Sequence, residues 1–394
     1  MGLLRIAGII IVALILVVAV VAAALFAGVL GAPSAGVEDE GDWGTVSEER
    51  TEVITTVWVD NPNPVGITLG DSVSVSYQLY LNDVNLASGE KAGISISSGN
   101  NTVQTSTYIQ NRKIQPWWVA FVQNNETVTL GADATVSVSG PVSASTDISV
   151  PERTLLADET PVITSLSGAA SGFEGRHTES VSRERLLDRT GLEWTGLLAE
   201  GYVTDGDTEA TVGYEIQDGW AEWGAVNEET TTVYFNLRVH NPGDVPVPAT
   251  PDRLGADVEM NDVEMFSAQA NDTSLQNPDD FATGEVIGER VIRPGETEVA
   301  VYAVEMDNEK VDDWFRSHVS NGERTDVRTE LQVVFTVGEL EFSIPEDNPV
   351  AYTCQLQTAI LVDDQNTTTN CGDGPGAVES IGDRTSVPTA DAAP

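Results

Sequence analysis

Hydrophobic and polar residues alternate in short runs along most of the chain after residue 42, and the runs end at Asn, Gly or Pro. Two of them, TTVWVD at 55–60 and VYFNLRVH at 233–240, each stop at an Asn-Pro pair, Asn61-Pro62 and Asn241-Pro242. Proline has no amide hydrogen for a sheet ladder and asparagine favours turns, so each pair marks the end of a strand. Asn82-Asp83 separates two further runs, as a hairpin turn does. Short alternating strands at regular spacing predict two-sheet antiparallel sandwiches.

Two segments interrupt this alternation with helical spacing. PWWVAFVQ at 116–123 and DDWFRSHV at 312–319 place their aromatic residues on one stripe, and the runs end at Asn124 and at Asn321-Gly322. We interpret Trp117, Trp118, Trp314 and Phe315 as core anchors, because paired aromatic residues on a one-faced helix normally pack against a sheet. Each sandwich is therefore expected to carry one short helix.

The chain repeats itself. Trp43-Gly44 and Trp223-Gly224 are 180 positions apart, and the two Asn-Pro pairs keep the same offset. After an insertion of about 17 residues in the second copy, Trp117-Trp118 aligns with Trp314-Phe315 at an offset of 197. This predicts tandem domains. The expected organisation is an anchor at 1–33, a first sandwich at 42–153, a linker at 154–200, a second sandwich at 201–371 and a disordered tail at 372–394.

The first residues read as a membrane span. Ile6 to Leu30 contains no charge, and ~20 apolar residues in a helix suffice to cross the hydrocarbon core. Arg5 precedes the run and acidic residues follow it from Glu38, which places a short N-terminus in the cytoplasm and the bulk of the chain outside the cell membrane. A cleaved signal peptide is the alternative, although its apolar region is usually only about 7 to 15 residues long.

The chain is strongly acidic, with 62 Asp and Glu against 19 Lys and Arg and a net charge of −43. Nucleic acid is excluded as a partner, because binding it requires clustered cations. Hydrophobic residues make up 41% of the chain, so the charge belongs on folded surfaces and not on a core-poor segment. Folded domains of this charge suit molar salt and indicate an extreme halophile. A calcium-dependent acidic protein is the rival interpretation.

If the bulk of the chain is exported, as predicted, a disulfide and glycosylation are the modifications to expect. Cys354 and Cys371 are predicted to form a disulfide outside the cell, with a pair of buried free thiols as the alternative. Sequons at Asn100, Asn125, Asn271 and Asn366 are candidate glycosylation sites for the same reason.

No catalytic constellation is recognisable. His177, His240 and His318 are isolated in the sequence, and there is no nucleophile elbow, phosphate loop or zinc-protease motif. The segment from Asp205 begins like a calcium loop but has Ala210 where the sharp turn requires Gly. We therefore predict a non-enzymatic protein with no catalytic residue, no cofactor and no metal site.

Both copies resemble the type 2 late-embryogenesis-abundant family, also called the water stress and hypersensitive response (WHy) domain. The resemblance rests on Asn61-Pro62-Asn63, the run YQLYLND from Tyr77 to Asp83, the Gly89 that follows, and the aromatic helix. The second copy departs from the pattern, because Gly243 stands after Asn241-Pro242 where the first copy has Asn63. The resemblance implies a mainly β fold of fibronectin- or immunoglobulin-like antiparallel sandwiches, each with one short helix, in stress-protective proteins that often follow a single membrane anchor.

Three functions follow as hypotheses: a stress-protective or envelope-associated binding module, a structural or adhesive surface spacer, and a lipid-binding module. The expected partners are the membrane, through the N-terminal helix, and an envelope protein or a lipid.

Overall fold

The computed structural model describes residues 34–64, 66–68, 73–92, 95–138, 144–156, 160–172, 174–182, 209–249, 253–268, 291–337, 340–346, 350–362 and 365–371. The predicted membrane span Ile6 to Leu30, the sequon at Asn271 and the tail 372–394 lie outside these residues. Within the described ranges, no helix combines the length and the apolar character that crossing a bilayer requires.

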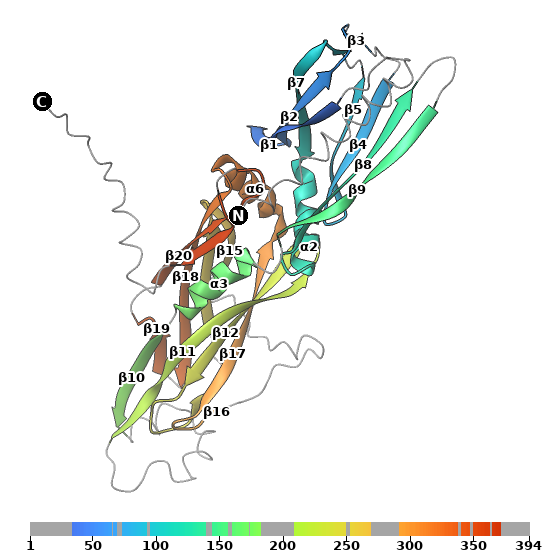
Figure 1. The fold of residues 1–394 in the computed structure, drawn as a ribbon. Helices are drawn as coiled ribbons and strands as arrows, with labels where there is room; N and C mark the ends of the chain where they lie inside the picture. The colour runs from blue at the N-terminus through green and yellow to red at the C-terminus, as the bar shows by residue number, and fades with distance from the viewer. Residues whose placement is uncertain are drawn as a thin grey trace, which may run out of the picture. The chain divides into compact units, whose positions relative to one another are not determined.

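The contacts of the chain divide it into two units. Unit 1 comprises Met1–Thr160, Val311–Arg324 and Thr358–Thr367, and unit 2 comprises Pro161–Lys310, Thr325–Gln357 and Thr368–Pro394. The described part of both units is mainly β, as the alternating pattern predicts (Figure 1).

Unit 1 contains antiparallel sheets in the orders β1-β2-β7 and β5-β4-β8-β9, with a short pair β3-β6. The strand order brings together segments far apart in the sequence, since β2 pairs along its whole length with β7. The bounds are β1 Ser34–Val46, β2 Arg50–Asn61, β3 Ile67–Thr68, β4 Val73–Leu81, β5 Val84–Ala92, β6 Ser95–Ile96, β7 Gly99–Gln110, η2 Asn111–Lys113, α2 Ile114–Gln123, β8 Val128–Val138, β9 Ala144–Leu156 and α6 Val311–Ser320.

Unit 2 contains the sheet β10-β11-β12-β17, the sheet β15-β14-β18-β20-β21 with β19 on β18, and the short pair β13-β16. The bounds are α3 Pro161–Ser171, β10 Gly175–Ser182, β11 Glu209–Val226, β12 Thr230–His240, β13 Val247–Pro248, β14 Arg253–Met260, β15 Val263–Ala268, β16 Val291–Ile292, β17 Thr297–Asp307, η4 Asn308–Lys310, β18 Arg324–Val337, β19 Leu340–Ile344, β20 Val350–Gln357 and β21 Thr368–Cys371.

The two hairpin turns have the same backbone. Asn82 and Asp83 have φ of 47° and 63°, and Asn261 and Asp262 have φ of 51° and 62°. Two successive left-handed residues make the turn whose twist matches that of the strands, and Asn and Asp tolerate this conformation well. The hairpin predicted at Asn82-Asp83 is confirmed by the pairing of Leu81 with Val84.

The stretch 154–200, which we predicted to be a linker, contains α3 and β10 among its described residues. α3 lies along β11 (Figure 1) and also contacts β20 and β21, while β10 pairs with β11 from Gly175 to Ser182. The helix is built from small residues, and Ser165, Ala169 and Ala170 are buried. Small side chains let the helix approach the sheet closely, which is why a composition typical of linkers forms a packed element here.

The core of unit 2 is centred on aromatic side chains between its two large sheets. Tyr214 stacks on Phe335 with ring centroids 3.9 Å apart, and Phe342 packs edge-on against Tyr214. All three are essentially inaccessible to solvent. In β18 the odd-numbered residues are buried, and most of the even-numbered ones are more exposed. This alternation arises because one face of the strand packs into this core.

Candidate functional site

In each Asn-Pro motif the asparagine side chain makes hydrogen bonds at the point where a strand ends. Asn61 accepts a hydrogen bond from the Asn63 amide through Oδ1 at 3.1 Å and donates to the Ser97 carbonyl. Asn241 does the same with the Gly243 amide at 2.9 Å and donates to the carbonyl of Ile292. Both asparagines are buried, whereas Pro62 is exposed. These residues hold loops in place and have no geometry for chemistry.

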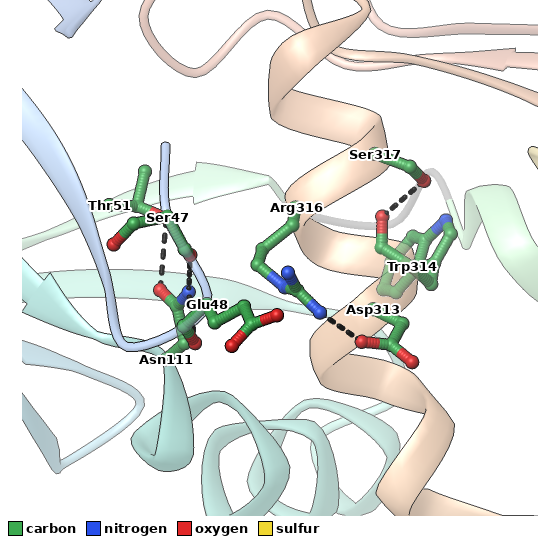
Figure 2. A network of polar contacts seen from close by, with 8 residues as sticks. All are labelled: Ser47, Glu48, Thr51, Asn111, Asp313, Trp314, Arg316 and Ser317. Carbon is green, nitrogen blue, oxygen red and sulfur yellow. Dashed lines mark hydrogen bonds and ion pairs between the residues drawn. The ribbon is translucent and has the colours of Figure 1, made fainter. Parts of the chain in front are cut away.

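A second buried asparagine follows a long strand in each unit. Asn111 accepts from the Thr51 hydroxyl at 2.9 Å and donates to the Ser47 carbonyl at 2.7 Å, which fixes the β1–β2 turn (Figure 2). Asn308 repeats the arrangement, accepting from Thr231 at 2.8 Å. A buried amide that satisfies both its donor and its acceptor groups is a structural clamp.

The aromatic residues predicted as core anchors come together in unit 1. Trp118 is fully buried, and Trp117, Trp314 and Phe315 are nearly so. Trp118 packs edge-on against Trp314 with centroids 5.5 Å apart, and Trp117 meets Phe315 at 6.5 Å. The helix α6 thus packs against α2 in unit 1, where the sequence had led us to expect one helix in each sandwich. Edge-to-face aromatic pairs stabilise a fold by more than the burial of their apolar area alone.

Both helices end in the same way. The Glu126 amide donates to the Phe121 carbonyl at 2.8 Å, and the Glu323 amide donates to the His318 carbonyl at 2.9 Å. Glu126 and Glu323 both have φ of 59° and are buried. A left-handed residue that bonds back across the last turn terminates a helix. A glutamate at this position is unusual, because it carries a side chain at a backbone conformation that favours glycine.

The Glu323 carboxylate is the centre of a polar network that the sequence did not reveal. Its Oε1 accepts from the indole Nε1 of Trp43 at 2.9 Å and from the amides of Leu361 and Val362. Its Oε2 accepts from the Thr358 hydroxyl at 2.9 Å and from the Ile360 amide. The charge is therefore compensated by donors, as a buried carboxylate requires. The network fastens residues 358–362 to the turn after α6.

His318 lies beside this network and is buried. Its Nε2 is 2.9 Å from the Thr358 hydroxyl oxygen. Burial lowers the pKa of His318 to about 4, although the nearby Glu323 carboxylate opposes this shift. The imidazole is therefore neutral at physiological pH, and with the carboxylate already surrounded by donors the pair has no accessible face for acid–base catalysis.

The exposed side of α6 carries a charged group. Arg316 forms an ion pair with Asp313, one helical turn earlier. Figure 2 shows the Arg316 side chain lying toward Asp313, with Glu48 of the β1–β2 turn nearby. Burial raises the pKa of Asp312 to about 6, opposed by Arg316 and assisted by Asp313. In the described ranges, no three His, Cys, Asp or Glu side chains are arranged to hold a metal ion.

The two cysteines form a disulfide between paired strands, Cys354 on β20 and Cys371 on β21. The predicted bridge is thus present in unit 2. Gly168 of α3 faces the Cys371 sulfur so closely that a Cβ at this position would collide with it. The sequons Asn100, Asn125 and Asn366 are exposed, so their positions are compatible with modification.

The outer face of the sheet β5-β4-β8-β9 in unit 1 offers the open surface that a ligand needs. A hollow of about 490 Å³ lies over β5, β4 and β8, and a second of about 330 Å³ lies over β4, β8 and β9. Both include Asp133. The hydroxyl, amide and carboxylate residues of the two linings are Ser76, Gln78, Ser88, Glu90, Asp133, Thr135, Tyr80, Asp83, Thr129 and Glu152. We take this polar face as the candidate site.

Comparison with known proteins identifies the part of the chain that carries this face. Residues 56–153 match the family model described as late embryogenesis abundant protein. This region is a late-embryogenesis-abundant-type (LEA-type) domain. Its span includes β4, β5, β8, α2 and most of β9, so both hollows are formed by residues of the LEA-type domain.

More distant matches add little. An uncharacterized protein of Methanocaldococcus jannaschii is 34% identical over 73 residues, which is 18% of this chain and 40% of that protein. The chain therefore spans less than half of that relative. A crystal structure of a protein from Archaeoglobus fulgidus shares 19% identity, with 32% of this chain and 97% of that chain covered and a TM-score of 0.25. The exo-chitosanase CsxA of Amycolatopsis orientalis shares 13% identity over 73% of this chain and 25% of its own, with a TM-score of 0.14.

Proposed function

We propose that the protein is a non-enzymatic, stress-protective protein of a halophile, anchored in the cell membrane by its N-terminal segment, with its folded parts outside. The observation that carries this proposal is the LEA-type domain at 56–153, set in a chain with a net charge of −43. Carboxylates hold water and cations at a surface, so an acidic folded domain keeps neighbouring molecules hydrated when water becomes scarce.

The same reasoning extends to the second half of the chain. We propose that both halves are WHy-type copies, because the order of elements in β11 to β18 follows the order in β1 to β8, including the short pair, the helix and the Asn-Asp turn. The buried Asn111 and Asn308 with their threonine partners support this assignment. Neither asparagine is predicted by strand patterning alone.

The lipid-binding hypothesis receives no support from the described hollows, which are lined by polar and acidic side chains where an acyl chain requires an apolar wall. The spacer hypothesis makes a different claim, namely that the domains hold a partner at a fixed distance from the membrane. Cross-linking of the chain to a surface-layer protein, without any stress phenotype, would favour the spacer.

A drying assay tests the protective function directly. The full chain, in a detergent, is dried together with a labile dehydrogenase and rehydrated, and the recovered enzyme activity is measured. We expect higher recovery than with an immunoglobulin-like sandwich of ordinary charge at the same mass concentration. Equal recovery with both proteins would count against protection by this surface.

A further inference from the structure

We propose that the outer face of the sheet β5-β4-β8-β9 binds a polyhydroxylated, non-anionic ligand, a sugar or a glycan chain, along the two hollows that share Asp133. This binding is separate from the stress-protective function and does not depend on it.

The register of the strands arranges the polar groups in rows. Ser76 lies opposite Glu90 on one side and Thr135 on the other, and Gln78 lies opposite Ser88 and Asp133. Side chains that are direct neighbours across strands lie about 5 Å apart, and those two positions along a strand about 6.6 Å apart. Hydroxyl, amide and carboxylate groups therefore alternate over the floor of the larger hollow.

This mixture of groups matches the chemistry of a sugar. Each sugar hydroxyl both donates and accepts a hydrogen bond, so it needs carboxylate or amide oxygens as acceptors and hydroxyl or amide groups as donors. The carboxylates of Glu90 and Asp133 provide acceptors, and the Gln78 amide nitrogen and the Ser88 hydroxyl provide donors. The Thr135 hydroxyl donates to Asp147 and can accept from a ligand. An apolar ligand would displace water from these polar side chains without offering hydrogen bonds in exchange, at a cost in affinity.

The smaller hollow adds an aromatic surface. Tyr80 lies directly opposite Gly131 in the pairing of β4 with β8, and both line the hollow. Gly131 has no side chain, and a Cβ at this position would lie 3.4 Å from Glu152 Cγ, so Glu152 borders the space that the missing side chain leaves. The Tyr80 hydroxyl is directed by a hydrogen bond to Gln78 Oε1. Tyr80 is half-buried and lines this hollow, so the accessible part of its ring can contact the C–H face of a sugar, while Glu152 and Asp83 in the same lining can accept hydrogen bonds.

Charge and size define the ligand further. The acidic side chains around the two hollows repel phosphate, sulfate and uronate groups, so a neutral or aminated glycan is preferred. The volumes of about 490 and 330 Å³ fall in the range of small-molecule sites. Because the hollows adjoin at Asp133 and are open to solvent, a chain of several sugar rings can lie across both.

Isothermal titration of the full chain in a sugar-free detergent tests the proposal, with three hexasaccharides as probes: a neutral glucan, a glucosamine oligomer and a galacturonate oligomer. We expect the first two to bind and the galacturonate oligomer to bind at least about tenfold more weakly. Absence of binding by both of the first two probes, or equal binding by the anionic one, would overturn the proposal.

Substitutions locate the site. Tyr80→Ala and Asp133→Ala should each weaken binding at least about tenfold, whereas Tyr80→Phe should retain most of the affinity because the ring remains. Tyr108→Ala and Asp60→Ala are the matched controls, since both residues are exposed on the other sheet of unit 1. Circular dichroism confirms that each variant folds. Equal weakening by the control substitutions, or unchanged binding by folded Tyr80→Ala and Asp133→Ala, would refute a site on this face.

Discussion

Glu323→Gln is the substitution that most sharply tests the buried network in unit 1. Glutamine has the shape of glutamate but replaces one carboxylate oxygen by an NH2 group, which cannot accept hydrogen bonds. In the native chain Oε2 accepts from the Thr358 hydroxyl and the Ile360 amide, while Oε1 accepts from Trp43 and the two following amides. Whichever way the glutamine side chain is turned, its NH2 group faces the donors that one of the two carboxylate oxygens accepts from in the native chain.

The magnitude follows from the less costly orientation. With the NH2 group in the place of Oε2, the Thr358 hydroxyl can rotate to accept, but the Ile360 amide is left without its partner. A hydrogen bond to a charged group contributes ~1.5 to 3 kcal/mol, and a buried unpaired donor adds a desolvation penalty. We therefore expect the free energy of unfolding to fall by about 3 to 5 kcal/mol.

Urea denaturation in concentrated KCl, followed by tryptophan fluorescence, measures this change. Glu309→Gln is the matched control, because it removes the same charge from an exposed position. A Thr358→Val variant and the double variant complete a thermodynamic cycle, in which we expect a coupling of about 1 to 2 kcal/mol between the two side chains. A loss for Glu323→Gln within ~0.5 kcal/mol of the control would mean that the carboxylate does not hold residues 358–362 in place.

Three further predictions concern charge, pH and the disulfide. The melting temperature should rise by roughly 10 °C or more from dilute buffer to concentrated KCl, because salt screens the charge of −43; an unchanged value would refute the halophilic interpretation. Because burial lowers the pKa of His318, the unfolded chain binds its proton first, so stability attributable to His318 is present above pH ~6.5 and is lost as pH falls toward 4. In the His318→Gln variant, the unfolding free energy should therefore fall by ~3 kcal/mol less between pH 6.5 and pH 4 than in the native chain. Denaturation at each pH measures this difference, and parallel pH profiles of the two proteins would exclude the effect. Cys371→Ser should cost ~3 kcal/mol of unfolding free energy, because the bridge closes a loop of 17 residues, and a native chain that loses nothing on reduction would show that the bridge is dispensable.

The features predicted correctly from the sequence are those with local signals. Asn82-Asp83 specifies its turn by the backbone preferences of its two residues, and Asn61-Pro62 ends a strand through the missing proline amide. The helical spacing of PWWVAFVQ is sufficient to indicate α2, and that of DDWFRSHV to indicate α6. The expectation of an oxidising exterior, together with the presence of two cysteines, predicted the disulfide that the structure contains.

The features missed depend on distant partners. Glu323 is one of 62 acidic residues, and nothing in the neighbouring sequence distinguishes it from a surface glutamate. Trp43 lies 280 positions away, and the other donors are mostly backbone amides, which leave no mark in the sequence. The one available signal was the repeat, because Glu126 occupies the equivalent position after α2.

Composition did not predict α3. Its Ser, Gly and Ala residues are typical of linkers, yet Gly168 is required where the helix approaches the disulfide and Gly219 of β11 is required where the strand approaches the Ala170 carbonyl. Small residues at a close helix–sheet contact and small residues in a linker have the same composition. Only their burial separates the two, and burial depends on the tertiary fold.

Survival after drying tests the central claim most directly. A strain that lacks this chain is compared with the parent strain and with strains that express either the native chain or the Glu323→Gln variant, all dried and then rehydrated in concentrated salt. The account predicts lower survival without the chain, full recovery with the native chain and partial recovery with the destabilised variant. Equal survival of the deletion strain and its parent would contradict a stress-protective function.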